Sequence, residues 1–409
     1  MLVFKYTYAI ITFMKRLSGF ILFIYVFALD TLQAQDVQLL FHSNQMLQSV
    51  KTALSENSVK QQQLAELKKR ANLWLTKPIN SVVAKRQSTP CGNPHEYMSM
   101  ASYYWPDSSK PDGLPYIRKD GQRNPANELV PDHTSINDWI TAVTTLGWTY
   151  YFTGEEQYAK RAVSFLKFWC IDTATYMIPN LNHAQIIRGI DTGRGIGIID
   201  IHLLPNLLEA TQLLENYPAY TTSDKNLVKA WFVHLLNWLQ SSENGKQEMQ
   251  TKNNHKTYYE LLIAALSVYS GEQKLSQDVF QNAKQLLLAQ IDANGLQALE
   301  TERTNGLSYS IFNLSAWFQL ATLAAQHGVD LWNYPSKENA RIKLAIQYAL
   351  PYVTGKQQWP LQQINALQPD DFFRLLNRAS QTYPAANFDA FTGNFVYKSA
   401  NPIHDLFYR

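Results

Sequence analysis

The sequence is poor in cysteine and in net charge, and each shortage excludes a class of protein. Its 409 residues include two cysteines, Cys91 and Cys170, and neither stands in a C-x-x-C pair or another metal-ligand spacing. Whether the two form a disulfide stays open. The net charge is +3, from 36 basic and 33 acidic residues, and no Lys/Arg run is long enough to indicate nucleic acid. An anionic partner must therefore meet a local basic cluster.

Low-complexity tracts and strand-like alternation of apolar and polar residues are also nearly absent. The remaining composition, with 46% hydrophobic and 17% charged residues, is typical of a globular protein with a large core. A chain of this length permits two or three domains, but helical toroids of the same size fold as one unit.

The first 34 residues have the pattern of a secretory signal peptide. The basic pair Lys15-Arg16 precedes an apolar run over residues 19–29, and Ala34 stands before polar sequence. The apolar run is too short for a spanning helix, and no cysteine follows it to carry a lipid. We therefore expect a signal peptide over residues 1–34 and one soluble domain over residues 35–409, secreted or periplasmic, with no membrane partner after cleavage.

Helical periodicity dominates the rest of the chain. It runs through residues 37–74, and from residue 132 onward a unit of helix, tight turn, helix and longer loop repeats four times. Such hairpins build either an open superhelix or a closed toroid, and the long loops favour the toroid. The predicted fold class is all-α, an incomplete or closed (α/α) toroid of antiparallel helical hairpins. Its predicted helices cover residues 134–152, 155–169, 197–214, 225–239, 254–269, 274–291, 309–326, 337–352 and 370–383.

Residues 77–131 form a long irregular stretch rich in Pro, Gly, Asn, Asp and aromatic residues. A loop of this length within a compact domain is usually either functional or disordered, and its aromatic content argues against disorder. We interpret it as the wall or lid of a binding cleft.

The pair Asn254-His255 stands at the start of an apolar helical segment. The asparagine suits a helix cap, whereas the histidine lies in the first turn between Lys252 and Lys256. A helix N-terminus and neighbouring cations favour the neutral imidazole, which can accept a proton. His255 is therefore a candidate base.

Arg303 and Tyr309 are six residues apart across a glycine-bearing turn at the start of another predicted helix. A fixed guanidinium lowers the pKa of a nearby phenol and can bind a carboxylate through two parallel hydrogen bonds. Arginine and tyrosine at a helix start are also common for structural reasons, so this pair alone does not define a site.

A third group, Asn182, Gln185, Arg188 and Arg194, lies in a loop that leads into a helix. It is either a network of capped turns or a surface that binds sugar hydroxyls and carboxylates.

Together these motifs resemble the alginate-lyase superfamily of helical-toroid polysaccharide lyases, which are secreted bacterial enzymes. The resemblance covers residues from about His95 to Tyr383 and rests on the runs 97–107, 179–185, 254–255 and 302–310. Each run alone is unspecific, and their combination in this order is specific. The pair Asn305-Gly306 departs from the family's pattern.

In that family an Asn-His pair, an Arg and a Tyr form the active site. The resemblance therefore implies that the catalytic residues are Asn254, His255, Arg303 and Tyr309. The implied reaction is a β-elimination on a 1,4-linked polyuronate, with alginate as the first candidate substrate and glucuronan as the second. Asn254 and Arg303 would neutralise the uronate carboxylate, His255 or Tyr309 would take the C5 proton, and Tyr309 would protonate the leaving oxygen. The phenol could serve both roles if Arg303 keeps its pKa near the working range.

The expected partner is an anionic polysaccharide, with neither nucleic acid nor membrane involved. The scheme requires no cofactor and no metal, and the sequence has no His/Asp/Glu metal spacing. Predicted substrate-binding residues are Tyr103, Tyr104, Trp105, Asn182, Gln185, Arg188, Arg194 and Tyr258.

Two alternatives of other kinds remain open. A glycoside hydrolase on the same scaffold would need two opposed carboxylates, and the available ones are Asp138, Asp191, Asp200, Glu260 and Glu300. A non-catalytic exported sugar-binding protein would explain the hairpins and the aromatic loop, but gives no reason for His255, Arg303 and Tyr309 at the starts of separate hairpins.

Overall fold

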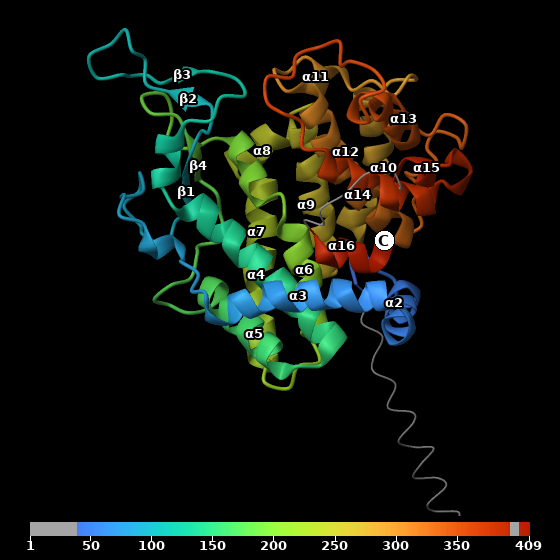
Figure 1. Ribbon diagram of the computed structural model, residues 1–409. Helices are drawn as coiled ribbons and strands as arrows, with labels where there is room; N and C mark the ends of the chain where they lie inside the picture. Colours follow the sequence, from blue (N-terminus) through green and yellow to red (C-terminus); the bar gives the residue numbers. More distant parts are fainter. Residues whose placement is uncertain (1–38, 393–400) are drawn as a thin grey trace, which may run out of the picture. The chain divides into compact units, whose positions relative to one another are not determined.

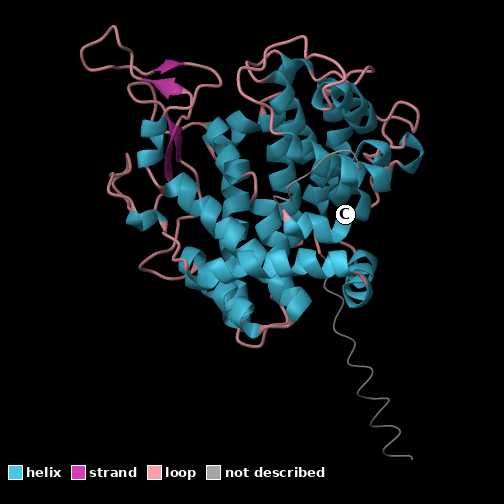
Figure 2. Cartoon of the chain, in the orientation of Figure 1, coloured by secondary structure: helices cyan, strands magenta, loops and turns pink. Residues whose placement is uncertain are grey.

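The structure, a computed structural model, is mainly helical over the residues it describes, 39–392 and 401–409, and long loops connect the helices (Figures 1 and 2). The predicted signal peptide over residues 1–34 lies outside the described residues. Leu39 to Arg409 form a single unit. None of the helices in the described ranges combines the length and the hydrophobicity needed to cross a bilayer.

Most helix boundaries agree with the periodicity of the sequence to within a few residues. The α-helices are α2 (Asn44–Glu56), α3 (Ser58–Thr76), α4 (Asp132–Thr153), α5 (Glu156–Cys170), α6 (Leu204–Leu213), α7 (Thr222–Ser241), α8 (Glu243–Met249), α9 (Asn254–Ser270), α10 (Gln273–Gln290), α11 (Ala298–Thr301), α12 (Gly306–Gln326), α13 (Arg341–Val353), α14 (Pro369–Thr382), α15 (Asp389–Thr392) and α16 (Pro402–Tyr408). Short 3-10 turns are η1 (Val82–Ala84), η2 (Pro125–Leu129), η3 (Gly195–Ile201) and η4 (Pro384–Ala386).

Two predicted helical stretches are divided. Asn57 separates α2 from α3: its backbone is extended and its side chain accepts hydrogen bonds from the N–H groups of Val59 and Lys60, which caps α3. The predicted helix over residues 197–214 begins as η3 and becomes α-helical only at Leu204. Pro205 in the first turn of α6 has no N–H to continue the helix from η3.

Seven helices form a closed ring of contacts in the order α4, α6, α9, α12, α14, α16 and α3, which returns to α4. Outside this ring α5 packs on α4, α7 and α10 pack on α9, and α13 packs on α12. The predicted all-α toroid is therefore confirmed in its closed form, and the open superhelix is wrong. Closure joins segments far apart in sequence, because Lys60 on α3 donates to the carbonyls of Asp405 and Leu406 on α16 at 3.0 and 2.7 Å.

The few strands lie in and beside the long loop, at the upper left of Figure 1. β1 (Met98–Met100) pairs in parallel with β4 (His183–Ile186), and β2 (Tyr104–Trp105) pairs antiparallel with β3 (Ile117–Arg118). A buried ion pair fixes the loop to the helices: Lys85 Nζ lies 3.0 Å from Asp132 Oδ2 at the start of α4, and both side chains are almost fully buried. The loop is thus built into the body of the protein.

Gln290 at the end of α10 organises the polar interior next to the start of α9. Its Oε1 accepts hydrogen bonds from Thr257, Asn313 and Trp317 at 2.8 to 3.0 Å. Its Nε2 donates to the carbonyls of residues 252 and 253, both at 2.9 Å. Because these carbonyls directly precede Asn254, this one buried side chain sets where α9 begins.

Candidate active site

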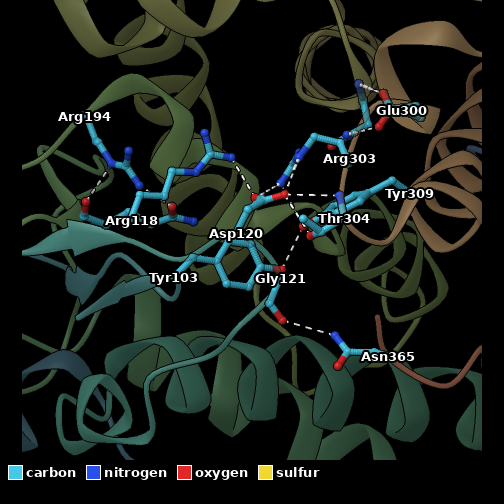
Figure 3. A network of polar contacts seen from close by, with 12 residues as sticks. Tyr103, Arg118, Asp120, Gly121, Arg194, Glu300, Arg303, Thr304, Tyr309 and Asn365 are labelled. Carbon is cyan, nitrogen blue, oxygen red and sulfur yellow. Dashed lines mark hydrogen bonds and ion pairs between the residues drawn. The ribbon is translucent and has the colours of Figure 1, made fainter. Parts of the chain in front are cut away.

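The four predicted catalytic residues lie at the beginnings of α9 and α12 and in the turn after α11. Arg303 and Tyr309 are in direct contact: Arg303 Nη2 donates to the Tyr309 hydroxyl at 3.1 Å, and the guanidinium carbon lies 4.1 Å from the centre of the phenol ring (Figure 3). The six-residue spacing across the Gly306 turn therefore brings the two groups together as expected.

Asn254 is held by a buried carboxylate that the sequence analysis placed only among hydrolase candidates. Glu300 on α11 accepts from the Asn254 backbone N–H and from its Nδ2, both at 2.6 Å, and both residues are 1% exposed. Burial raises the pKa of Glu300, although the hydrogen bonds from Asn254 oppose this shift. Glu300, rather than an asparagine cap, satisfies the first N–H of α9 and fixes the orientation of the amide.

His255 is held in the same way by Glu248 on α8. Its Nδ1 lies 2.8 Å from Glu248 Oε1, and the carboxylate is 1% exposed. Since an ionised carboxylate only accepts, Nδ1 carries the proton, and Nε2 has no partner among the described residues. The neighbouring Lys256 pairs with Glu260. The cations expected beside His255 from the sequence are therefore joined by a carboxylate, Glu248, which no local pattern had marked.

The surroundings of Tyr309 raise the pKa of its phenol. Its hydroxyl lies 2.8 Å from the Tyr103 hydroxyl, on the long loop. Burial, together with Tyr103, raises the pKa of Tyr309 above the ordinary value, and the opposing effect of Arg303 does not compensate. The condition for Tyr309 to serve as both base and acid, a pKa near the working range, is therefore not met in the free protein, where Tyr309 is a protonated phenol.

Asp120 is a further member of the site that the sequence analysis missed. Its carboxylate accepts from Arg303 Nη2 at 2.8 Å and Nε at 3.2 Å, from Thr304 Oγ1 at 2.9 Å and from Arg118 Nη2 at 2.7 Å (Figure 3). The hydrogen bonds and charge of Arg303 outweigh burial and hold the pKa of Asp120 well below its usual range. Nothing local in the sequence marks this aspartate, because its main partner is 183 residues away.

We call residues 118–122 the strap, because they connect the long loop to the far side of the site. Besides Asp120, Asn365 Nδ2 donates to the Gly121 carbonyl at 3.1 Å. Gly121 has φ of +72°, and a Cβ there would lie 2.6 Å from Thr304 Oγ1, so only glycine fits. The strap thus contacts Thr304, the residue directly after Arg303, and Asn365.

Two members of the third predicted group, Gln185 and Arg194, are bonded to each other. Arg194 donates to the Gln185 carbonyl at 2.9 Å and to its Oε1 at 3.1 Å, and Gln185 Nε2 donates to Asp200 at 2.8 Å. Gln185 also has a left-handed backbone with φ of 51°. The network therefore fixes the position of Arg194, whose guanidinium lies 5.2 Å from the centre of the Tyr104 ring. Burial lowers the pKa of Arg194.

The other predicted substrate-binding residues differ in their surroundings. Trp105 donates to the Gln122 carbonyl at 3.0 Å, which supports the strap. Asn182 accepts from Trp238 at 3.0 Å, and the Arg188 guanidinium lies 5.7 Å from the centre of the Tyr116 ring.

The prediction that Tyr258 binds substrate is wrong. Tyr258 is 4% exposed, its hydroxyl donates to the Phe312 carbonyl at 3.0 Å and its ring packs on Phe312. It therefore belongs to the core.

A polar cavity of about 300 Å³ lies between the first turns of α4 and the long loop. Ser102 lines it, whereas the next residue, Tyr103, reaches Tyr309, so the cavity and the catalytic group share one wall. Arg123 lies at its edge, exposed and without a hydrogen bond or ion pair to any described residue. The remaining lining is polar for the most part: Ser99, Met100, Asn124, Asn127, Val130, His133, Thr134, Asn137, Asp138 and Asp200.

The two cysteines and the acidic side chains form no metal centre in the described part of the chain. Cys91 is exposed and Cys170 is buried, and both are free thiols. Within residues 39–392 and 401–409, no group of three or more His, Cys, Asp or Glu side chains is arranged to hold a metal ion.

Comparison with known proteins places this site in a family. The model of the alginate lyase family matches residues 81–359. An alginate lyase from Bacteroides ovatus has a TM-score of 0.85 and 38% identity over 91% of this chain and 99% of its own. Two further structures share the fold. A substituted alginate lyase A1-III complexed with tetrasaccharide has a TM-score of 0.59 and 17% identity over 89% of this chain and 94% of its own. Alginate lyase A1-III from Sphingomonas species A1 has a TM-score of 0.56 and 18% identity over 84% of this chain and 94% of its own. No curated protein matches the chain.

The helical toroid and the family match together define a polysaccharide lyase. The chain belongs to the alginate lyase family, as the resemblance of its motifs implied.

Proposed function

We propose that the protein cleaves alginate by β-elimination and leaves an unsaturated uronate at the new chain end. The observation that carries this proposal is the contact between Arg303 and Tyr309, next to an Asn254-His255 pair that buried carboxylates hold in place. The similarity to an alginate lyase from Bacteroides ovatus supports alginate as the polymer. Glucuronan, the second candidate from the sequence, has no structural observation in its favour.

The chemistry explains why these groups are needed. Removing the C5 proton leaves an electron pair that forms the C4–C5 double bond, while the C4–O4 bond breaks and O4 takes a proton. The C5 proton becomes acidic only when the neighbouring carboxylate is neutralised, so stabilisation must act on the enolate-like state. The Asn254 amide and the Arg303 guanidinium are the groups that would do this.

The two proton transfers of the reaction suit His255 and Tyr309, because one side chain can accept a proton and the other can donate one. His255 Nε2 is free of partners among the described residues and, with Nδ1 protonated, can accept the C5 proton. Tyr309 is a protonated phenol and can donate to O4. After one turnover His255 carries an extra proton and Tyr309 lacks one, so exchange with water or between the two groups restores the starting state.

The hydrolase alternative loses its support, because each candidate carboxylate already has structural partners. Asp138 pairs with Lys77, Glu260 with Lys256, and Glu300 holds Asn254. Asp191 accepts from the backbone N–H groups of residues 187 and 193, and Asp200 accepts from Tyr97, Ser99 and Gln185. Asp138 and Asp200 line the same polar cavity, and both are engaged by these partners.

We further propose that the mature protein is exported and acts in the periplasm or outside the cell. The signal-peptide pattern of residues 1–34 and the predicted polymer substrate support this location. Mass spectrometry of the N-terminus of protein recovered from the culture medium and from cell fractions tests it. A chain that retains residues 1–34 and stays in the cytoplasm contradicts the proposal.

The test of the reaction follows ultraviolet absorbance of the new C4–C5 double bond while purified protein meets mannuronate-rich alginate, guluronate-rich alginate and glucuronan. We expect absorbance to rise when the protein meets an alginate. The rate of this rise should be about 100-fold or more lower for Tyr309→Phe, because the phenol that protonates O4 is gone. Tyr116→Phe, a change on the same loop as Tyr103, is the matched control. No rise on any polyuronate would overturn the lyase proposal, and a rise on glucuronan alone would replace the substrate.

A further inference from the structure

The carboxylate of Asp120 contacts the catalytic arginine more closely than any other described group. It lies 2.8 Å from Arg303 Nη2 and 3.2 Å from Nε, and its second fixed partner, Thr304, is the next residue of the chain. Asp120 itself belongs to the strap. The two side chains are about one-fifth exposed, so the pair lies at the surface of the cleft rather than in the core.

Counting the donors of Arg303 shows what this contact does. A guanidinium has five N–H donors. Asp120 takes Nε–H and one hydrogen of Nη2, the Tyr309 hydroxyl takes the other hydrogen of Nη2, and no described residue accepts from Nη1. Two donors, both on Nη1, therefore remain for a substrate carboxylate.

We propose that Asp120 is a positioning residue for the elimination: it holds Arg303 so that Nη2 contacts the Tyr309 hydroxyl and Nη1 stays available for the uronate carboxylate. This role rests on the proposed function. It assigns the strap a part in the chemistry, because Asp120 reaches Arg303 from residues 118–122, which also contact Thr304 and Asn365.

The charges around Tyr309 give this proposal a measurable consequence. Groups from three parts of the chain face the phenol or its partners: Tyr103 from the loop, Arg118 and Asp120 from the strap, and Glu300 and Arg303 from α11 and its following turn. His255 acts in turn on Glu300. Arg303 lowers the pKa of Tyr309, and the negative Asp120 raises it. Removing the charge of Asp120 therefore lowers the pKa of Tyr309.

Asp120→Asn is the direct test, because it keeps the shape and removes the charge. We expect kcat to fall about tenfold or more while KM changes less, since the substrate keeps its Nη1 contact but Arg303 loses its orientation. The alkaline limb of the pH profile of kcat/KM, which reports loss of the Tyr309 proton, should move to lower pH by about one unit, which is the size of one close charge interaction. Asp120→Glu, which restores the charge, should recover most of both.

Asn365→Ala is the matched control, because it releases the other strap contact without changing the charge on Arg303. It should leave the pH profile where it is. An Asp120→Asn enzyme with unchanged kcat and pH profile, or an Asn365→Ala enzyme with the same pH shift, would overturn the positioning role.

A second readout does not depend on turnover. In protein labelled with ¹³C at the tyrosine rings, the Tyr309 signal is identified by its loss in Tyr309→Phe, and its titration is compared between the original chain and Asp120→Asn. A lower titration midpoint in Asp120→Asn supports the proposal even if no polyuronate is cleaved. The absence of cleavage would then contradict only the proposed function. An unchanged midpoint contradicts the proposal whether or not the protein is active.

Discussion

At the scale of single residues, the site consists of polar side chains that are each fixed by a charged neighbour. Glu300 holds Asn254, Glu248 holds His255 and Asp120 holds Arg303, through hydrogen bonds of 2.6 to 3.2 Å. Such neighbours limit the freedom of a reacting group before substrate arrives, and this preorganisation is a large part of catalysis.

Glu248→Gln tests the support of His255. The amide keeps the volume of the side chain but no longer balances a positive imidazole, and it can rotate to present N–H instead of oxygen to Nδ1. We expect kcat to fall about 10- to 100-fold, because the base loses both orientation and stabilisation of its protonated form. Steady-state kinetics on the preferred polymer measures this.

Glu243→Gln is the control for that change. Glu243 lies on the same short helix, α8, but its side chain is 82% exposed and pairs only with Lys246. It should leave kcat within about twofold of the original. If Glu248→Gln is as active as this control, His255 does not depend on the carboxylate.

The residue scale also shows what the sequence could and could not predict. Arg303 and Tyr309 were recognisable because six residues and one turn separate them, and motifs of the family mark both. Glu248 and Asp120 were not, because the first lies on a short helix with no apolar periodicity and the second meets its partner across 183 residues. Tyr258 was predicted to bind substrate, and its side chain instead points into the core.

At the scale of elements, the helices that carry the site begin where buried polar groups hold them. Gln290 on α10 bonds Thr257, Asn313 and Trp317 and also the two carbonyls that precede α9. Helix pattern alone predicted α9 and α12 to within three residues. It could not predict that one amide side chain connects both helices to α10, since that depends on tertiary packing.

Gln290→Leu should therefore destabilise the protein strongly. Leucine has a similar volume but leaves several buried donors and acceptors unpaired, at about 1–3 kcal/mol for each group that water cannot reach. We expect the free energy of unfolding to fall by about 3 kcal/mol or more, measured by urea denaturation followed by circular dichroism.

Gln285→Leu provides the comparison. Gln285 lies on the same helix but is exposed, so its replacement should change the free energy of unfolding by no more than about 0.5 kcal/mol. Equal stability of the two variants would mean that the Gln290 network contributes little.

At the scale of the whole described unit, the toroid depends on its last helix. Phe407 on α16 packs against His42 and Trp148, with ring centres 4.0 and 5.2 Å apart, and so links both ends of the unit to α4. The sequence analysis predicted the toroid from the repeat of hairpins but did not predict α16 or the ring that it closes. A helix of seven residues is too short to show a clear periodicity.

Phe407→Ala should lower the free energy of unfolding by about 3–5 kcal/mol, because a large buried ring is replaced by a cavity where the ring of helices closes. Phe407→Leu keeps most of the volume and should cost less than about 1.5 kcal/mol. Thermal and urea unfolding of both variants give the comparison. Similar losses for both, or none for either, would show that α16 does not hold the ring closed.

The closure of the ring by α3 and α16 also has a consequence for how the chain is made. The contact between Lys60 and Asp405 joins residues that are 345 positions apart. On the ribosome, α3 emerges long before α16 exists, so it must wait through most of translation for the helix that completes its surroundings. Hairpins in the middle of the chain can pair as they appear, whereas the joint between the two ends is made last.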